Sequence, residues 1–224
     1  MNRKPFRSML PGLFVLPVVV AAYAGGWAVI TIEDLPDSVV ARQPISLTFT
    51  VRQHGIRPLP GLKPQVEAKA GSLEAKAAAN PTVEAGRYTA TLALPQPGDW
   101  AITIHSGFGN SRVTLLPVRA IAPGTGAVSS LPEAERGRRL FVAKGCITCH
   151  VHGELSGANT ISVGPELTGR RYPAEYLRQF LANPAIAAAP RRDGPQMPNL
   201  NLKQQEIAAL VAFINAERQT RAGK

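Results

Sequence analysis

The pentapeptide Cys-Ile-Thr-Cys-His at residues 146–150 is the stretch of this 224-residue chain best equipped for chemistry. Its two thiols stand three positions apart, so each can add to a vinyl group on the same edge of one porphyrin. The imidazole of His150 follows Cys149 directly and is placed to coordinate the iron. These residue types at this spacing predict the covalent attachment site of one haem c at Cys146, Cys149 and His150.

Two other kinds of site use similar residues. A Cys-x-x-Cys pair can form a redox disulfide, and with His150 and His152 the segment holds four groups of the types that bind zinc. A redox pair usually opens a helix after a strand, whereas this motif follows a helix-like run at residues 133–144. A zinc site normally takes its second pair of ligands from a separate turn. Haem is therefore favoured, with the disulfide and zinc sites as alternatives.

Met197 is the predicted second axial ligand of the iron. Methionine occurs only at positions 1, 9 and 197, and Met197 lies in a polar, proline-flanked stretch from which its thioether can reach a metal. His150 and Met197 would fill both axial positions and leave none for oxygen or peroxide. We therefore expect one-electron transfer rather than catalysis, in a free carrier or a subunit of a larger oxidoreductase. A haem enzyme or gas sensor with a labile methionine is an alternative.

The charge of the chain favours acidic partners. The formal net charge is +10 and the pI about 10.2, which suits acidic redox proteins or anionic lipid. The excess is divided evenly between the two halves of the chain, so no basic arm stands out and nucleic acid is not expected as a partner. Both cysteines lie in the pentapeptide, and no structural disulfide is expected.

The N-terminal segment has the pattern of an export signal. Three basic residues within the first seven precede an apolar run at residues 9–20, and Ala-Tyr-Ala at 22–24 is a small-x-small cleavage site. Residues 1–24 are predicted to be a signal peptide, with an uncleaved membrane anchor as the alternative. Either reading places the body of the protein in the periplasm or on the outer face of the cytoplasmic membrane, and the anchor would associate it with that membrane.

Residues 25–121 alternate apolar and polar side chains with the period of half-buried strands. Proline and glycine punctuate the intervals. We expect an immunoglobulin-like β-sandwich held by packing alone, with Tyr88 as a tyrosine corner whose hydroxyl ties its strand to a loop. The predicted strands cover residues 27–32, 45–52, 66–70, 87–94, 100–105 and 112–118.

This segment resembles the YtkA-like family of exported β-sandwich domains. The likeness rests on FTVRQHG at residues 49–55, GRY at 86–88 and PGDW at 97–100. Relatives linked with copper handling or oxidase assembly make His54 a candidate copper ligand, and this is a second alternative function. His54 and His105 need not meet, and the sandwich has no cysteine or methionine to complete a soft site. A docking or spacing module is the favoured role.

A linker rich in Pro, Gly, Ser and Ala at residues 122–131 separates the sandwich from a helical part at 132–224. Ser130 with Glu133, and Asn201 with Gln204, have the pattern of capping boxes that begin the first and last helices. A third helix is expected at residues 173–182. Three helices over this length predict a small all-α bundle around a cofactor.

Residues 132–217 resemble a class I c-type cytochrome domain. Gly137 and Phe141 stand where that family packs its first helix against the last, near Phe213. The resemblance implies that the Pro165 carbonyl accepts the Nδ1 proton of the haem histidine, as a bond that orients the imidazole. It also implies a donor to a haem propionate near the third helix, for which Tyr172, Arg170 and Arg171 are the candidates. Expected partners are membrane or soluble redox proteins.

Overall fold

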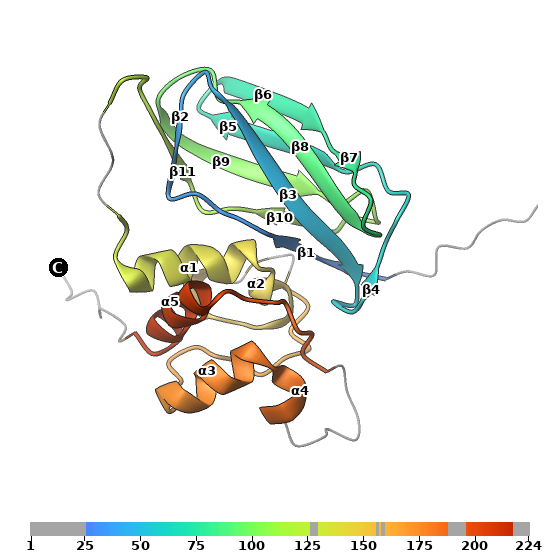
Figure 1. Cartoon of the computed structure of the whole chain (residues 1–224), viewed down its shortest axis with the longest axis vertical. Coiled ribbons are helices and arrows are strands. Elements are labelled where there is room, and N and C mark those ends of the chain that lie inside the picture. Colours follow the sequence, from blue (N-terminus) through green and yellow to red (C-terminus); the bar gives the residue numbers. More distant parts are fainter. Residues whose placement is uncertain (1–25, 126–129, 156, 158–159, 188–195, 217–224) are drawn as a thin grey trace, which may run out of the picture.

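The computed structural model describes residues 26–125, 130–155, 157, 160–187 and 196–216 (Figure 1). The predicted signal peptide or anchor at residues 1–24 lies outside these ranges. Among the described residues, no helix combines the length and the apolar composition needed to cross a membrane.

The N-terminal part is built from two β-sheets, as the alternating pattern predicts. The first sheet has the order β1-β3-β8-β7, with the short β4 paired to β3, and all of its pairs are antiparallel. Because β1 lies at its edge, one side of this sheet ends beside the helices (Figure 1). Its strands are β1 (Ala28–Ile32), β3 (Pro44–Gln53), β4 (Arg57–Pro58), β7 (Asn80–Pro81) and β8 (Arg87–Ala93).

The second sheet has the order β2-β11-β9-β5-β6, with β10 also paired to β9. The β2–β11 pair is parallel and the other pairs are antiparallel. Residues of both sheets fill one hydrophobic core, in which Phe49, Tyr88 and Trp100 are fully buried. Its strands are β2 (Ser38–Val40), β5 (Gln65–Ala70), β6 (Leu73–Ala78), β9 (Gly98–His105), β10 (Arg112–Thr114) and β11 (Val118–Ile121).

Tyr88 makes the bonds expected of a tyrosine corner. Its hydroxyl donates to the Leu59 carbonyl at 2.6 Å and accepts from the Leu62 amide at 3.0 Å. Both bonds tie β8 to the loop at residues 59–62. The immunoglobulin-like assignment itself stays a prediction.

Two strand expectations need correction. The single strand predicted at residues 112–118 is two strands, β10 and β11, that pair with different parts of β9 and are separated by Leu115, Leu116 and Pro117. Proline lacks the N–H that a continuous ladder would need. β6 was not predicted, because on the side of LEAKAA that packs against the core two alanines follow Leu73, and alanine favours strands weakly. Pairing with β5, which is a tertiary contact, makes it a strand.

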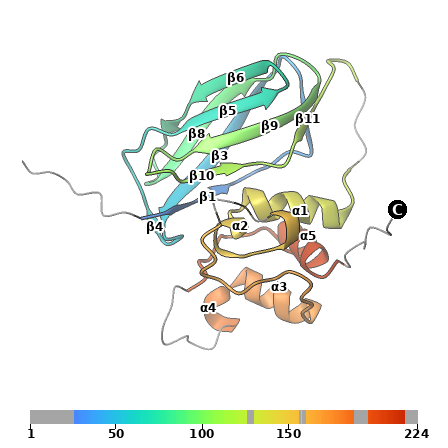
Figure 2. The same ribbon diagram turned by 180° about the vertical axis from the view of Figure 1, so that it is seen from behind.

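The C-terminal part is mainly helical (Figures 1 and 2). Helices α1 and α5 pack on each other, and α3 packs against α5 from the other side. The third helix begins one residue later than expected, after Pro173, and ends at Ala182 as predicted. The helices are α1 (Glu133–Ala143), α2 (Cys146–Cys149), α3 (Ala174–Ala182), α4 (Pro184–Ala187) and α5 (Gln204–Ile214), with a 3-10 turn at Gly153–Leu155.

Both predicted capping boxes are wrong about the capping residue. Pro132 occupies the N-cap position of α1, and no side chain caps this end. The adjacent Leu131 amide donates a hydrogen bond to the Asp37 carboxylate of the sandwich at 3.4 Å. A tertiary contact therefore replaces the local cap expected from Ser130. Lys203, not Asn201, occupies the N-cap position of α5, and its amide donates to the Glu206 carboxylate at 2.9 Å.

The helices pack directly against the edge of the first sheet. Every residue of β1 is buried, and Val142 and Ala143 of α1 belong to the core of the sandwich. A Cβ built on Gly145 would lie 2.5 Å from Val29 Cγ1 and 2.7 Å from the Ile30 oxygen. Because real Cβ atoms do not come this close, only glycine fits at this contact. The two parts therefore share buried surface beyond the linker at residues 122–131.

Candidate functional site

Gly145 sets the direction in which the pentapeptide leaves α1. It has φ +78 in the left-handed region, which glycine adopts without steric cost, and its amide bonds the Val142 carbonyl at 3.0 Å. The chain turns here and continues into the one-turn helix α2. The two cysteines thus follow the end of α1, which packs against Val29 and Ile30 of β1 at Gly145.

His150 is held in one orientation by the loop at residues 161–167. This loop runs beside the pentapeptide and is tied to it by backbone bonds: Ile161 to Thr148 at 2.7 Å, Gly164 to Cys149 at 2.9 Å and Leu167 to Val151 at 2.8 Å. The Pro165 carbonyl lies 2.9 Å from His150 Nδ1, so the neutral imidazole donates through Nδ1 and presents Nε2 for coordination.

Gly164 packs flat against the same imidazole. A Cβ built at this position would lie 2.5 Å from His150 Cε1 and 2.6 Å from Nδ1. No side chain can be added here without moving the ring. The ring is therefore positioned by a carbonyl on its edge and a glycine against its face.

A cavity of about 660 Å³ opens beside these residues. It lies within the size range typical of cofactor sites. Its walls come from α2, the loop at residues 163–167, α3, the stretch at residues 196–198 and α5. Groups that could hold a haem line it together: the thiols of Cys146 and Cys149, the imidazole of His150 and the thioether of Met197. Two thiols, an imidazole and a thioether in one largely apolar cavity fit a covalently attached haem.

The state of the thiols agrees less well with a redox disulfide or a zinc site. Burial raises the pKa of Cys146 to about 12, with the neighbouring Cys149 adding to the effect, and burial raises that of Cys149 to about 11. Reactive dithiols and zinc ligands depend on thiolates, which a lowered pKa would favour. No group of three or more His, Cys, Asp or Glu that could hold a metal ion occurs among the described residues.

The packing between α1 and α5 fixes the back of the cavity. A Cβ on Gly137 would lie 1.9 Å from the Ala209 oxygen, so the two helices touch at backbone distance. Phe141 and Phe213 pack at 5.5 Å between ring centroids, at the contact expected from the sequence. His152 stacks on Phe213 at 4.4 Å and is not part of the cavity lining. Its role here is in packing.

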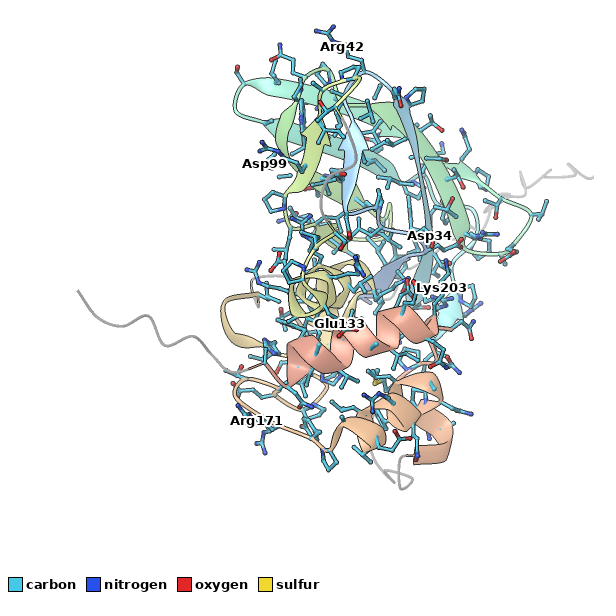
Figure 3. All side chains as sticks on the ribbon, turned by 60° about the vertical axis from the view of Figure 1, so that its left-hand side comes forward. Asp34, Arg42, Asp99, Glu133, Arg171 and Lys203 are labelled. Carbon is cyan, nitrogen blue, oxygen red and sulfur yellow. The ribbon has the colours of Figure 1, made fainter. Side chains whose placement is uncertain are left out.

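The candidates for a propionate donor divide into two groups. Tyr172 lines the cavity, and reciprocal bonds of 2.9 Å between its backbone and the Asn215 side chain fasten it to the end of α5. Arg170 and Arg171 are exposed and do not line the cavity, and Arg171 lies on the outside of its loop in Figure 3. Tyr176, which the sequence did not single out, also lines it. The propionate contact stays a prediction.

The structure brings two residues of the sandwich to the cavity. Trp27, just before β1, and His54, just after β3, line it, and their ring centroids are 5.2 Å apart. His105 lies on the other sheet, where its Nε2 is 3.8 Å from Glu67. The two histidines considered for copper are thus on different sheets. Nothing in the sequence near Trp27 pointed to the cavity, because the contact is made by the docking of two domains.

The comparison with known families agrees with this geometry. Residues 134–216 match the family model for cytochrome c. The C-terminal part is a cytochrome c domain. Such a domain implies covalently bound haem c and is consistent with electron transfer. The likeness of the preceding β-sheet part to YtkA-like proteins stays a prediction.

No curated protein matches the chain. Solved structures include domains 4 and 5 of the S-layer protein SbsC, with a TM-score of 0.31, 21% identity, and coverage of 42% of this chain and 51% of that one. The structure of SbsC domains 1–6 has a TM-score of 0.33 and 21% identity, and the match covers 46% of this chain and 14% of that one. The C-terminal domain of ZirS has a TM-score of 0.30 and 11% identity, and the match covers 54% of this chain and 87% of that one. The chain therefore spans about half the length of the first of these structures.

Proposed function

We propose that this protein is an exported carrier of single electrons. One haem c is bonded through Cys146 and Cys149, with His150 and Met197 as its axial ligands. The observation that carries the proposal is that these four side chains line one cavity of about 660 Å³. A haem held by His150 and Met197 would supply one-electron chemistry and would leave no position on the iron free for oxygen.

The residues of the chain have separate tasks in this proposal. His150 offers Nε2 to the iron while its Nδ1 proton is held by the Pro165 carbonyl at 2.9 Å, a bond that raises the basicity of the ligand. Met197 would supply the iron with a soft, weak donor, which would favour the reduced state over the oxidised one. Apolar side chains of α3 and α5 line the cavity and would limit the water around the haem.

The proposal extends to location and partners. The pattern of residues 1–24 supports export to the periplasm or attachment to the outer face of the cytoplasmic membrane. The net charge of +10 supports acidic redox proteins as partners, whose approach would be steered by charge. The sandwich would then help to dock the carrier.

Absorption spectroscopy and mass analysis test the proposal. The purified exported protein should have the mass of the polypeptide plus one haem, a low-spin reduced spectrum and a near-infrared band that depends on a thioether ligand. Met197→Ala should lose that band and bind added imidazole. Gln196→Ala, which changes the same stretch but keeps the sulfur, is the matched control and should retain the band. A polypeptide without attached haem, or a Met197→Ala variant with an unchanged spectrum, would refute the assignment.

A further inference from the structure

The wall of the cavity that faces the sandwich is made by two aromatic rings, Trp27 and His54. The His54 amide donates to the Trp27 carbonyl at 3.0 Å, which holds the two residues side by side where β1 begins and β3 ends. Their rings are tilted by 56° at 5.2 Å. Both His54 and Gly55 have positive φ, so this corner is a tight turn with a defined shape.

This corner sits against the residue that follows Met197. A Cβ on Gly55 would lie 3.3 Å from Pro198 Cγ, so the turn and the methionine stretch are in contact. Ile147, between the two cysteines, packs against the sandwich core. The sandwich therefore lies over both the segment that carries the thiols and the segment that carries the thioether.

Polar contacts hold the sandwich in this position. Lys144 Nζ donates to the Glu33 carbonyl at 2.6 Å, and Arg136 pairs with Asp37 at 2.8 Å. Lys203, before α5, pairs with Asp34, and Figure 3 shows these two side chains meeting across the boundary. Together with the burial of β1, these contacts make the corner a fixed wall. A spacer joined only through the linker would leave this side of the cavity open to water.

We propose that Trp27 and His54 are positioning residues of the haem site, which is thus completed by the sandwich. The inference rests on the proposed function and concerns only how water reaches the Met197 side of the cavity. Ferric haem carries one more positive charge than ferrous haem, and water stabilises the more charged form. Trp27 is half-buried and His54 is exposed. Where their rings displace water from this side of the cavity, the ferric form loses stabilisation and the midpoint potential rises. The same wall hinders water and small ligands from replacing the Met197 thioether.

The test uses the full exported protein and two measurements, a potentiometric titration and the binding of imidazole to the ferric form. Trp27→Ala and His54→Asn should each lower the midpoint potential. Each should also raise the affinity of the ferric form for imidazole by about tenfold, the scale of effects seen when residues that support metal ligands are replaced. Trp27→Phe keeps an aromatic ring and should restore most of both properties. Asparagine tolerates the positive φ of His54, so that variant tests the ring without straining the turn.

His105→Asn is the matched control, because His105 is a partly exposed histidine of the sandwich away from the cavity. It should leave both measurements unchanged. If Trp27→Ala and His54→Asn also keep the wild-type potential and imidazole affinity, the wall does not control access and the inference is overturned. Such a result would leave the electron carrier standing, provided that haem and the thioether band are present. Absence of haem from the wild type would instead remove the proposed function.

Discussion

Lys144 and Glu206 form an ion pair of 2.7 Å between the end of α1 and the first turn of α5. The Lys144 side chain is only 5% exposed and that of Glu206 12%. The same Nζ donates to the Glu33 carbonyl of the sandwich at 2.6 Å. One buried ammonium group thus joins both helices of the cytochrome c domain to the sheet beside them.

Replacing Lys144 by methionine should destabilise the protein by about 3 kcal/mol, since it leaves the Glu206 carboxylate buried without its cation. Urea unfolding of the holoprotein measures this. Lys69→Met is the control, because Lys69 is 57% exposed in an ion pair with Glu67 and solvent screens this pair, so its loss should destabilise the protein far less. Equal losses in the two variants would contradict a special role for the buried pair.

Gly137→Ala should disturb the contact between α1 and α5. The added Cβ would lie 1.9 Å from the Ala209 oxygen, which is backbone and cannot rotate away, so the helices must separate. We expect a loss of about 3 kcal/mol by thermal or urea unfolding, at the upper end of overpacking effects. In Gly157→Ala the new Cβ meets no atom within 4 Å, and stability should stay near that of the wild type. A Gly137→Ala protein as stable as this control would show that the helices do not pack as described.

The Asp37–Arg136 pair should make the attachment of the sandwich sensitive to acid. The hydrogen bond from the Arg136 guanidinium lowers the pKa of Asp37 below its ordinary value of 3.8, against the opposing effect of partial burial. A group whose pKa is lower in the folded state adds stability above the unfolded value and loses it as the pH falls through the folded value. The contribution is therefore complete at neutral pH, begins to decline near pH 3.8 and is lost once the pH falls below the lowered pKa of the folded state.

Urea unfolding of Asp37→Asn and wild type at several pH values checks this. The pair is about one-third exposed, so the difference at neutral pH should be below about 1 kcal/mol, and it should vanish in acid. Asp99→Asn removes a more exposed carboxylate that pairs with Arg119 within the sandwich, and should have a smaller effect at neutral pH. A difference for Asp37→Asn that grows as the pH falls would have the wrong sign.

Gly164→Ala should change the ligation of the proposed haem. The new Cβ would lie 2.5 Å from His150 Cε1 and force the imidazole to turn away from its bond to the Pro165 carbonyl. We expect a lower midpoint potential or a partly high-spin absorption spectrum. Pro165→Ala retains the carbonyl that accepts from His150 and serves as the control, with a spectrum close to wild type. An unchanged spectrum in Gly164→Ala would count against the rigid placement of the ring.

Much of the site could be predicted because its components are local. The pentapeptide at residues 146–150 and the thioether of Met197 are recognisable by residue type and spacing alone. The longer strands β3, β8 and β9 were found from alternation, which reflects burial of one face, whereas the short strands β2, β4 and β7 and the alanine-rich β6 were not. The predictions that Ser130 and Asn201 cap the first and last helices were wrong, because the backbone near each helix start bonds to other groups, some of them distant in sequence. The Leu131 amide, for example, is engaged by Asp37.

The sequence by itself determined the kind of chemistry, since a porphyrin attachment motif works through neighbours a few positions apart. Only the tertiary structure decided what surrounds that chemistry. Trp27 and His54 reach the cavity because β1 is buried beneath α1 and the Gly55 turn touches Pro198, contacts between residues separated by more than a hundred positions. No periodicity records such pairings, because docking depends on the summed shape and charge of two folded surfaces.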